Sequence, residues 1–270
     1  MFPSPFRPFA LLLLPLLIGL TGCDETPTGR KQLALIPEGQ MAQLGARSFA
    51  EIKSTQPIET DPRINAVVRC VAQAVVDALP EPHQSWEVVV FRNPQPNAFA
   101  LPGGKIGINT GILQVTETPD QLATIVGHEV AHVLVDHANE RLTQELGVSA
   151  ALMLVSLFLE NEGGLDQELI MKGLGLGAQY GVLLPYSRAH EQEADVLGLE
   201  LMARAGFDPR ASLNFWRNMS QAGGGQVPEL LSTHPSHGSR TETLSEVMEG
   251  MVQLQETALE QGRRPACAGG

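Results

Sequence analysis

The stretch TPDQLATIVGHEVAHVL, residues 118–134, decides the predicted fold. Thr118 suits the N-cap of a helix, Pro119 its first position and Gln121 its third position, where the side chain closes a capping box. Apolar residues then recur with helical period as far as about Gln144. We therefore predict a helix that begins at Pro119, continues to about Gln144 and is buried along one face.

The motif H-E-x-x-H occupies residues 128–132 of this predicted helix. His128 and His132 are four residues apart and share one helical face, so both imidazoles can reach a single metal ion. Glu129 is turned enough to address a water molecule beside that ion. The alternative is a solvated helix face that carries His and Glu by coincidence, but the neighbouring residues are small or apolar. The motif therefore predicts a hydrolytic zinc site.

A catalytic zinc site needs a third protein ligand and an open position. Glu191 and Asp195 are four residues apart in a second predicted helix, and small residues beside them permit close approach of the first helix. Glu193 instead shares a stripe with other charged residues, which is typical of a solvated face. We predict Glu191 as the third ligand and Glu193 as a surface residue. Asp195 is expected to accept the outer N–H of a ligating histidine, with a plain surface acid as the alternative.

The remaining pattern predicts an α+β fold that is mostly helical. Residues 64–79 have helical period, residues 86–91 form a β-branched run, and residues 97–101 and 105–109 are typical of strands joined by a glycine turn. We expect a small β-sheet whose edge strand flanks the motif helix. Further helices are expected at 148–159, 186–205, 210–222 and 239–261, and the glycine-rich stretch 163–181 is either a loosely packed helix or a mobile flap.

The first 22 residues have the pattern of a lipoprotein signal peptide. Arg7 precedes an apolar run that is too short to span a bilayer comfortably, and the run ends in Leu-Thr-Gly-Cys at Cys23. We predict that Cys23 is lipidated and holds the protein to a membrane of the cell envelope, on the periplasmic side. An ordinary cleaved signal and a short membrane anchor are the alternatives. The predicted organisation is 1–22 signal peptide, 23–32 tether, 33–262 catalytic domain and 263–270 tail.

Composition and cysteine content narrow the possible partners. The chain has 30 acidic and 18 basic residues and no basic run, so nucleic acid is not an expected partner. The hydrophobic content of 43% is enough for a buried core. An exported chain folds where disulfides persist, and Cys70 and Cys267 remain after Cys23 is used. These two cysteines either pair or stay as separate thiols.

Four stretches of the chain together resemble a known family. They are NAFALPGG at 97–104, HEVAH at 128–132, EQEAD at 191–195, and THP at 233–235 followed by Arg240. In this order and spacing they resemble the zinc metallopeptidases that include HtpX, the CAAX prenyl endopeptidases and the bacterial lipoprotein proteases LoiP and BepA. The chain stops too soon for the repeat domain of BepA, so LoiP-like is the closer description. The resemblance implies a zincin-like fold, one zinc ion on His128, His132 and Glu191, and Glu129 as general base.

The resemblance also suggests roles for two later residues. It places His234 and Arg240 against the substrate, as candidate donors to the developing oxyanion. In some relatives the matching histidine is instead a fourth zinc ligand that keeps the enzyme latent. Both roles of His234 stay open, beside that of a capping histidine before Pro235.

The predicted activity is endopeptidase cleavage of misfolded or damaged envelope proteins. Zinc would lower the pKa of a water molecule and Glu129 would take its proton. The substrate is expected in an extended conformation, as a strand added along Asn97, Ala98, Phe99 and Ala100. The alternatives are a chaperone-like quality-control factor that binds unfolded proteins with little proteolysis, and a structural lipoprotein with an accidental motif.

The other histidines receive lesser roles. His137 lies five residues after His132, about 140° round an ideal helix, so it cannot share the ion and is expected beside the site or on the surface. His83, His190 and His237 are expected to be ordinary histidines, because each lies in a loop or away from the metal-facing stripe.

Overall fold

The computed structural model describes residues 23–79, 85–160, 187–222, 229–234 and 240–267. The predicted signal peptide, the glycine-rich stretch 163–181, His83 and His237 lie outside these residues. The described elements are β1 (Cys23–Glu25), β2 (Lys31–Leu33), α1 (Glu38–Thr55), α2 (Pro62–Asp77), β3 (Glu87–Phe91), β4 (Ala98–Leu101), β5 (Lys105–Asn109), the 3-10 helix η1 (Thr110–Gln114), α3 (Pro119–Leu134), α4 (His137–Glu160), α6 (Arg188–Arg204), α7 (Ala211–Gln221), α8 (Glu229–Thr233) and α9 (Arg240–Glu260).

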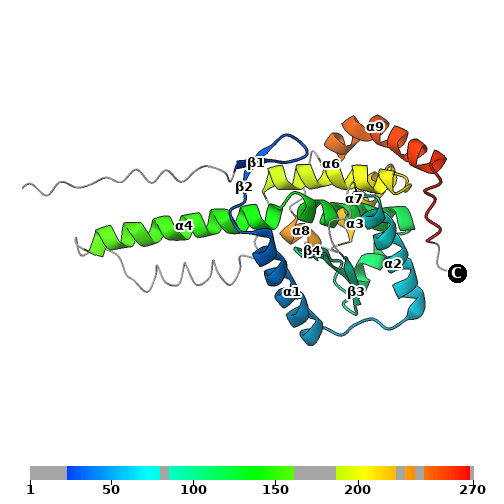
Figure 1. The fold of residues 1–270 in the computed structure, drawn as a ribbon. Coiled ribbons are helices and arrows are strands. Elements are labelled where there is room, and N and C mark those ends of the chain that lie inside the picture. Colours follow the sequence, from blue (N-terminus) through cyan, green and yellow to red (C-terminus); the bar gives the residue numbers. More distant parts are fainter. Residues whose placement is uncertain (1–22, 80–84, 161–186, 223–228, 235–239, 268–270) are drawn as a thin grey trace, which may run out of the picture.

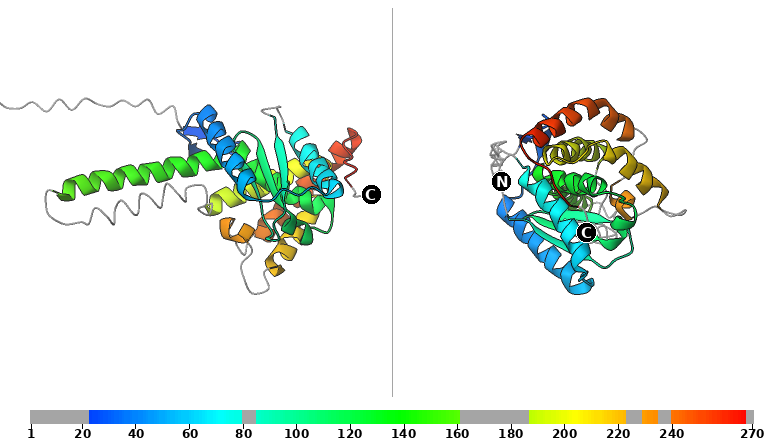
Figure 2. Two further views of the ribbon diagram at one scale, coloured as in Figure 1. Left: turned by 90° about the horizontal axis from the view of Figure 1, so that it is seen from below. Right: turned by 90° about the vertical axis from the view of Figure 1, so that its right-hand side faces the viewer.

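The fold is α+β and mostly helical, as predicted, and its elements are layered around α3. The three-stranded sheet lies on one side of α3, and α6 lies on the other side with α9 outside it (Figures 1 and 2). The strand order is β3-β5-β4, with β3 parallel and β4 antiparallel to β5. Within the described residues β4 is therefore an edge strand, and the motif helix packs against it.

Helix α3 begins where the capping residues predict and is buried over nearly its whole length. Thr118 is the N-cap and its hydroxyl accepts a hydrogen bond from the backbone N–H of Gln121. From Gln121 to His132 every residue is buried. Apolar side chains on α3 join those of α2 and the sheet in one core, which fixes the motif helix within packed surroundings.

The predicted extension of this helix to Gln144 is wrong. Helix α3 ends at Leu134, and Asp136 has φ of 52°, in the left-handed region. The chain turns there and α4 starts at His137, one helix to Glu160 where a separate helix at 148–159 was expected. Aspartate is among the few residues that tolerate left-handed backbone, so the break costs little. It changes the direction in which His137 points.

The predicted tether at residues 23–32 is also corrected. Strands β1 and β2 pair antiparallel, with Cys23 opposite Leu33. The turn between them, which includes Gly29 at φ 84°, is docked on the domain, because Arg30 forms ion pairs with Glu140 and Glu193. Residues 23–33 therefore form a hairpin, called here the N-terminal hairpin, that belongs to the folded domain.

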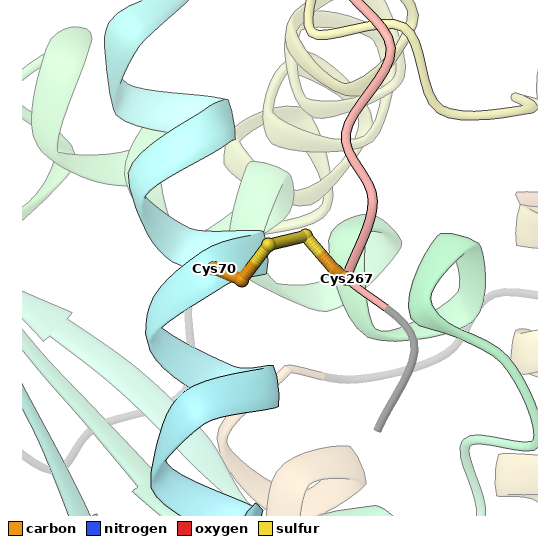
Figure 3. The surroundings of a disulfide bond; sticks show 2 residues. All are labelled: Cys70 and Cys267. Atoms are coloured by element: carbon orange, nitrogen blue, oxygen red, sulfur yellow. A yellow bond between two sulfur atoms is a disulfide. The ribbon is translucent and has the colours of Figure 1, made fainter. Parts of the chain in front are cut away.

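A disulfide joins Cys70 on α2 to Cys267, which answers the alternative that the sequence left open (Figure 3). It fastens the segment after α9 to the core, and Cys267 is itself buried.

Within the part of the chain that the structure describes, no helix combines the length and the apolar character that crossing a bilayer requires.

Candidate metal centre

The site is built on an unusually close contact between α3 and α6. A Cβ atom on Gly127 would lie 2.5 Å from the carbonyl oxygen of Gly198, and a Cβ on Gly198 would lie 2.6 Å from the backbone nitrogen of His128. Only hydrogen fits at both positions. This contact brings the H-E-x-x-H motif on α3 within reach of the carboxylates on α6.

Four buried side chains converge at one point: His128, His132, Glu191 and His234, named here the metal cluster. Nε2 of His128 lies 3.1 Å from Nε2 of His132 and 3.3 Å from Nδ1 of His234. The Glu191 carboxylate lies 3.6, 3.4 and 3.0 Å from His128, His132 and His234 respectively. The structure thus brings together the three predicted ligands and His234, which the resemblance had suggested as a possible fourth ligand.

These separations fit a zinc ion. Bonds of about 2.0–2.1 Å in a tetrahedral arrangement place the ligand atoms about 3.3 Å apart, and the observed separations scatter closely around that value. Imidazole nitrogen and carboxylate oxygen are ligands that zinc accepts. Among the described residues this is the one group of His, Cys, Asp and Glu whose ligand atoms approach one another so closely. The donor set and its spacing therefore suit zinc.

Glu129 lies beside the cluster, on the side that faces the sheet. One carboxylate oxygen accepts a hydrogen bond of 3.2 Å from the backbone N–H of Ala100 in β4, and the other lies 3.4 Å from Nε2 of His234. Burial raises the pKa of Glu129, and the neighbouring imidazoles of His234 and His128 offset only part of that effect. The carboxylate is placed between the candidate metal position and the edge strand.

The environment favours the metal-binding forms of His132 and Glu191. Burial lowers the pKa of His132 well below its usual value, so its imidazole is neutral. Burial alone would raise the pKa of Glu191, but the close imidazoles of His132 and His234 hold it far below its usual range. A neutral imidazole and an ionised carboxylate are the species that coordinate a cation.

Asp195 and Arg240 lie behind the ligands. Oδ1 of Asp195 is 2.9 Å from Nδ1 of His128, although the two groups are not aligned as a good hydrogen bond. The Arg240 guanidinium donates to Glu191 Oε2 and to Asp195 Oδ2, both at 2.6 Å, and stacks on Trp216 at 3.9 Å from the ring centre. Arg240 is thus buried against the back of Glu191. The contacts described for Arg240 are with Glu191, Asp195 and Trp216, and its expected role toward the substrate stays a prediction.

A second buried polar group borders the cluster, and the sequence did not predict it. Glu193, expected on the surface, is 6% exposed and contacts His137, Thr28 and Arg30. His190, expected to be ordinary, is buried, lies 3.2 Å from Glu140 and has its pKa lowered to about 4 by burial and by His137. The helical stripe of Glu193 was identified correctly, but the N-terminal hairpin covers it. This burial results from a tertiary contact with a segment distant in sequence, so the local sequence pattern could not predict it.

Comparison with known proteins adds an independent line of evidence. A model of the family described as Peptidase family M48 matches residues 60–248. The mitochondrial metalloendopeptidase OMA1 of Schizosaccharomyces pombe is 39% identical over 163 residues, which cover 60% of this chain and 46% of that protein. OMA1 of Bos taurus is 33% identical over 267 residues, with 91% and 50% covered. The beta-barrel assembly-enhancing protease of Escherichia coli is 26% identical over 208 residues, with 75% and 42% covered. The chain spans about half the length of these relatives.

Proposed function

The chain belongs to peptidase family M48, and from that membership we propose that it is a zinc-dependent endopeptidase. One observation carries the proposal: the ligand atoms of His128, His132, Glu191 and His234 surround a single point, and the carboxylate of Glu129 lies at its edge. Ligands together with a positioned carboxylate are what metal-assisted hydrolysis requires, whereas a purely structural zinc site needs no such carboxylate.

The mechanism assigns the proton transfers to Glu129. A zinc ion held by His128, His132 and Glu191 would supply Lewis acidity toward a peptide carbonyl and toward water at neutral pH. Glu129 takes the proton of the attacking water and later gives it to the leaving amine. Its raised pKa suits this double task, and its hydrogen bond from Ala100 fixes the carboxylate in place. Arg240 holds Glu191 from behind, so the ligand keeps its orientation through the reaction.

His234 fits the role of a latent fourth ligand. Its Nδ1 atom occupies the fourth position of the cluster, 3.0 Å from Glu191, which a catalytic zinc site leaves open. In this arrangement the imidazole excludes water and substrate from that position. Activation would require His234 to leave it.

The substrate would bind in an extended conformation along β4. The N–H of Ala100 points toward Glu129, so the backbone groups of Ala98 and Ala100 face away from β5. A peptide strand beside this edge would run close to Glu129, and main-chain pairing would tolerate many sequences. A peptide with N-methyl groups on the amides that pair with β4 should resist cleavage, and unchanged cleavage would contradict this binding mode.

The cell envelope is the proposed location, and misfolded or damaged envelope proteins are the proposed substrates. The signal-like sequence before Cys23 supports export, and the disulfide between Cys70 and Cys267 supports an oxidising compartment. The Escherichia coli relative is described by its name as a protease that enhances β-barrel assembly, and other relatives are described as mitochondrial.

A Glu129→Gln variant tests the enzymatic proposal. The amide keeps the shape of the side chain but cannot take a proton, so zinc should stay bound while cleavage of casein falls at least 100-fold. Elemental analysis gives the zinc content and a fluorescent casein assay gives the rate. Glu51→Gln, on an exposed position of α1, is the matched control and should behave as wild type.

Four outcomes, from this experiment and from cells that carry the active or the inactive enzyme, would count against parts of the proposal. Absence of stoichiometric zinc from the wild-type protein would indicate a structural lipoprotein. Undiminished cleavage by Glu129→Gln would remove Glu129 as the base. Rescue of envelope defects by the inactive variant would favour a chaperone-like factor, and an envelope proteome that is the same with active and inactive enzyme would exclude the proposed substrates.

A further inference from the structure

A continuous line of buried polar contacts leads from the metal cluster to the N-terminal hairpin. Nε2 of His132 faces the cluster, and its other nitrogen, Nδ1, lies 2.9 Å from Nδ1 of His137. Nε2 of His137 lies 3.1 Å from Oε2 of Glu193. The same oxygen accepts a hydrogen bond of 2.6 Å from Nε of Arg30. Arg30 belongs to the hairpin, more than a hundred residues away in sequence.

The hydrogen atoms along this line can be assigned from chemistry alone. The ionised carboxylate of Glu193 only accepts hydrogen bonds, so Nε2 of His137 must donate. A neutral His137 then has an accepting Nδ1, so Nδ1 of His132 must be the donor. His132 is left with a lone pair on Nε2, the atom that faces the metal position. Each contact therefore selects the tautomer of His132 that can bind zinc.

Arg30 is the positively charged partner of the buried Glu193 carboxylate, which also has Thr28 and His137 within hydrogen-bond distance. Glu193 is 6% exposed, and a buried carboxylate is costly without a charged partner. Arg30 also donates to both oxygens of Glu140, at 3.0 and 2.8 Å. Glu140 in turn pairs with His190, whose ring stacks on His137 with centres 4.4 Å apart. The Arg30 guanidinium thus donates to both carboxylates, Glu193 and Glu140, on the side of His137 that faces away from the metal cluster.

We infer that the N-terminal hairpin is a functional part of the metal site: Arg30, through Glu193 and His137, positions His132 for zinc. The inference rests on the proposed function and extends it to a segment outside residues 60–248, the range that matches the family model. Arg30, Glu193 and His137 are positioning residues, since none of them reaches the metal cluster except through His132. Loss of such a partner typically weakens metal binding 10- to 100-fold.

Zinc affinity tests the inference. Full-length protein is stripped of metal and titrated with zinc against a chromophoric chelator, which gives the dissociation constant without any reference to activity. Arg30→Met should weaken zinc binding about 10-fold or more. Lys31→Met removes a positive charge from the next residue, which is exposed, and should leave the affinity unchanged. With cobalt in place of zinc, the visible spectrum of Arg30→Met should differ from that of wild type, and the spectrum of Lys31→Met should not.

A pair of variants at His137 keeps the test independent of hairpin folding. The side chain of Asn can place an amide group near the position of Nδ1, so His137→Asn should retain more zinc affinity than His137→Leu. If Arg30→Met lowers the melting temperature of the zinc-free protein but binds zinc as tightly as wild type, the hairpin only stabilises the fold and the inference fails. Equal affinities for His137→Leu and wild type would also overturn it. A wild-type protein without zinc affinity would instead refute the proposed function itself.

Discussion

His234 carries two nitrogen atoms with different partners. Nδ1 points to Glu191 in the metal cluster, and Nε2 lies 3.4 Å from Glu129, the proposed base. The same imidazole therefore occupies the open ligand position and contacts the group that must receive a proton. The pKa of His234 is raised, because the charges of Glu129 and Glu191 outweigh the effect of burial. Its removal affects both groups at once.

A His234→Ala variant should bind zinc more weakly and cleave peptides faster than wild type. The affinity falls because one of four ligand atoms is lost, and the rate rises severalfold because the fourth position opens to water. A chelator titration and a fluorogenic peptide assay measure the two effects. A loss of activity of about 100-fold would instead assign His234 to stabilisation of the oxyanion. His132→Ala is the reference that should lose both zinc and activity.

Single residues also show where reasoning from the sequence stops. Helical geometry alone identified His128, His132 and Glu191, because their spacing contains the information. The same geometry, on the assumption that the helix continues, excluded His137 as a ligand of the ion and left it either beside the site or on the surface. The left-handed backbone at Asp136 breaks the helix, and Nδ1 of His137 lies 2.9 Å from Nδ1 of His132. The periodicity of apolar residues could not predict the left-handed conformation of this one aspartate.

At the scale of elements, the packing of α3 on α6 decides whether the ligands meet. Gly127 and Gly198 face each other. A methyl group on either glycine would collide with the backbone of the other helix. Glu191 and Asp195 lie on the same helix as Gly198, within two turns. Any separation of the helices would therefore move the third ligand away from the two histidines.

A Gly198→Ala variant should lose about 1–3 kcal/mol of stability through overpacking, and its zinc affinity should fall as well. Gly250→Ala is the matched control, because a Cβ there meets nothing within 4 Å on helix α9. That substitution should raise stability by about 0.5–1 kcal/mol, since alanine favours helix over glycine. Chemical denaturation and zinc titration of both variants provide the measurement. Equal behaviour of the two variants would show that the helix contact is adaptable.

The elements themselves were largely predictable. Capping residues marked the start of α3, alternation and glycine turns marked β4 and β5, and helical period marked α2 and α6. The N-terminal hairpin and α1 were not predicted, since their short or weakly patterned sequences carry little local signal. Their positions depend on contacts with α6 and the sheet, such as the ion pair of Arg30 with Glu193. Pairing between distant segments cannot be derived from local pattern.

At the scale of the whole molecule, the disulfide spans nearly the entire catalytic unit. Cys70 and Cys267 are 197 residues apart, and the closed loop contains every member of the metal cluster. Closing so long a loop lowers the conformational entropy of the unfolded chain, which stabilises the folded state. In Figure 3 the bond links α2 to the segment that follows α9.

A Cys70→Ala/Cys267→Ala double variant should be less stable by about 2–5 kcal/mol and should keep its zinc affinity. The loss of stability follows from the larger freedom of the unfolded chain. The affinity is preserved because neither cysteine contacts the metal cluster. Denaturant midpoints with and without the bond give the first quantity, and a zinc titration gives the second. A strong loss of affinity in the folded variant would show that the bond also shapes the site.

With Cys23 lipidated, as proposed, the N-terminal hairpin would also set the distance between the catalytic domain and the membrane. Ten unstructured residues would let a tethered domain move about 35 Å from its anchor. Here Cys23 is itself paired with Leu33 in the hairpin, so these residues do not act as a flexible linker. Acyl chains on Cys23 would hold the catalytic body at a fixed height over the lipid headgroups. Such an enzyme would cleave only polypeptide that lies near the bilayer surface. Its substrates would then be selected by their distance from the membrane as well as by their sequence.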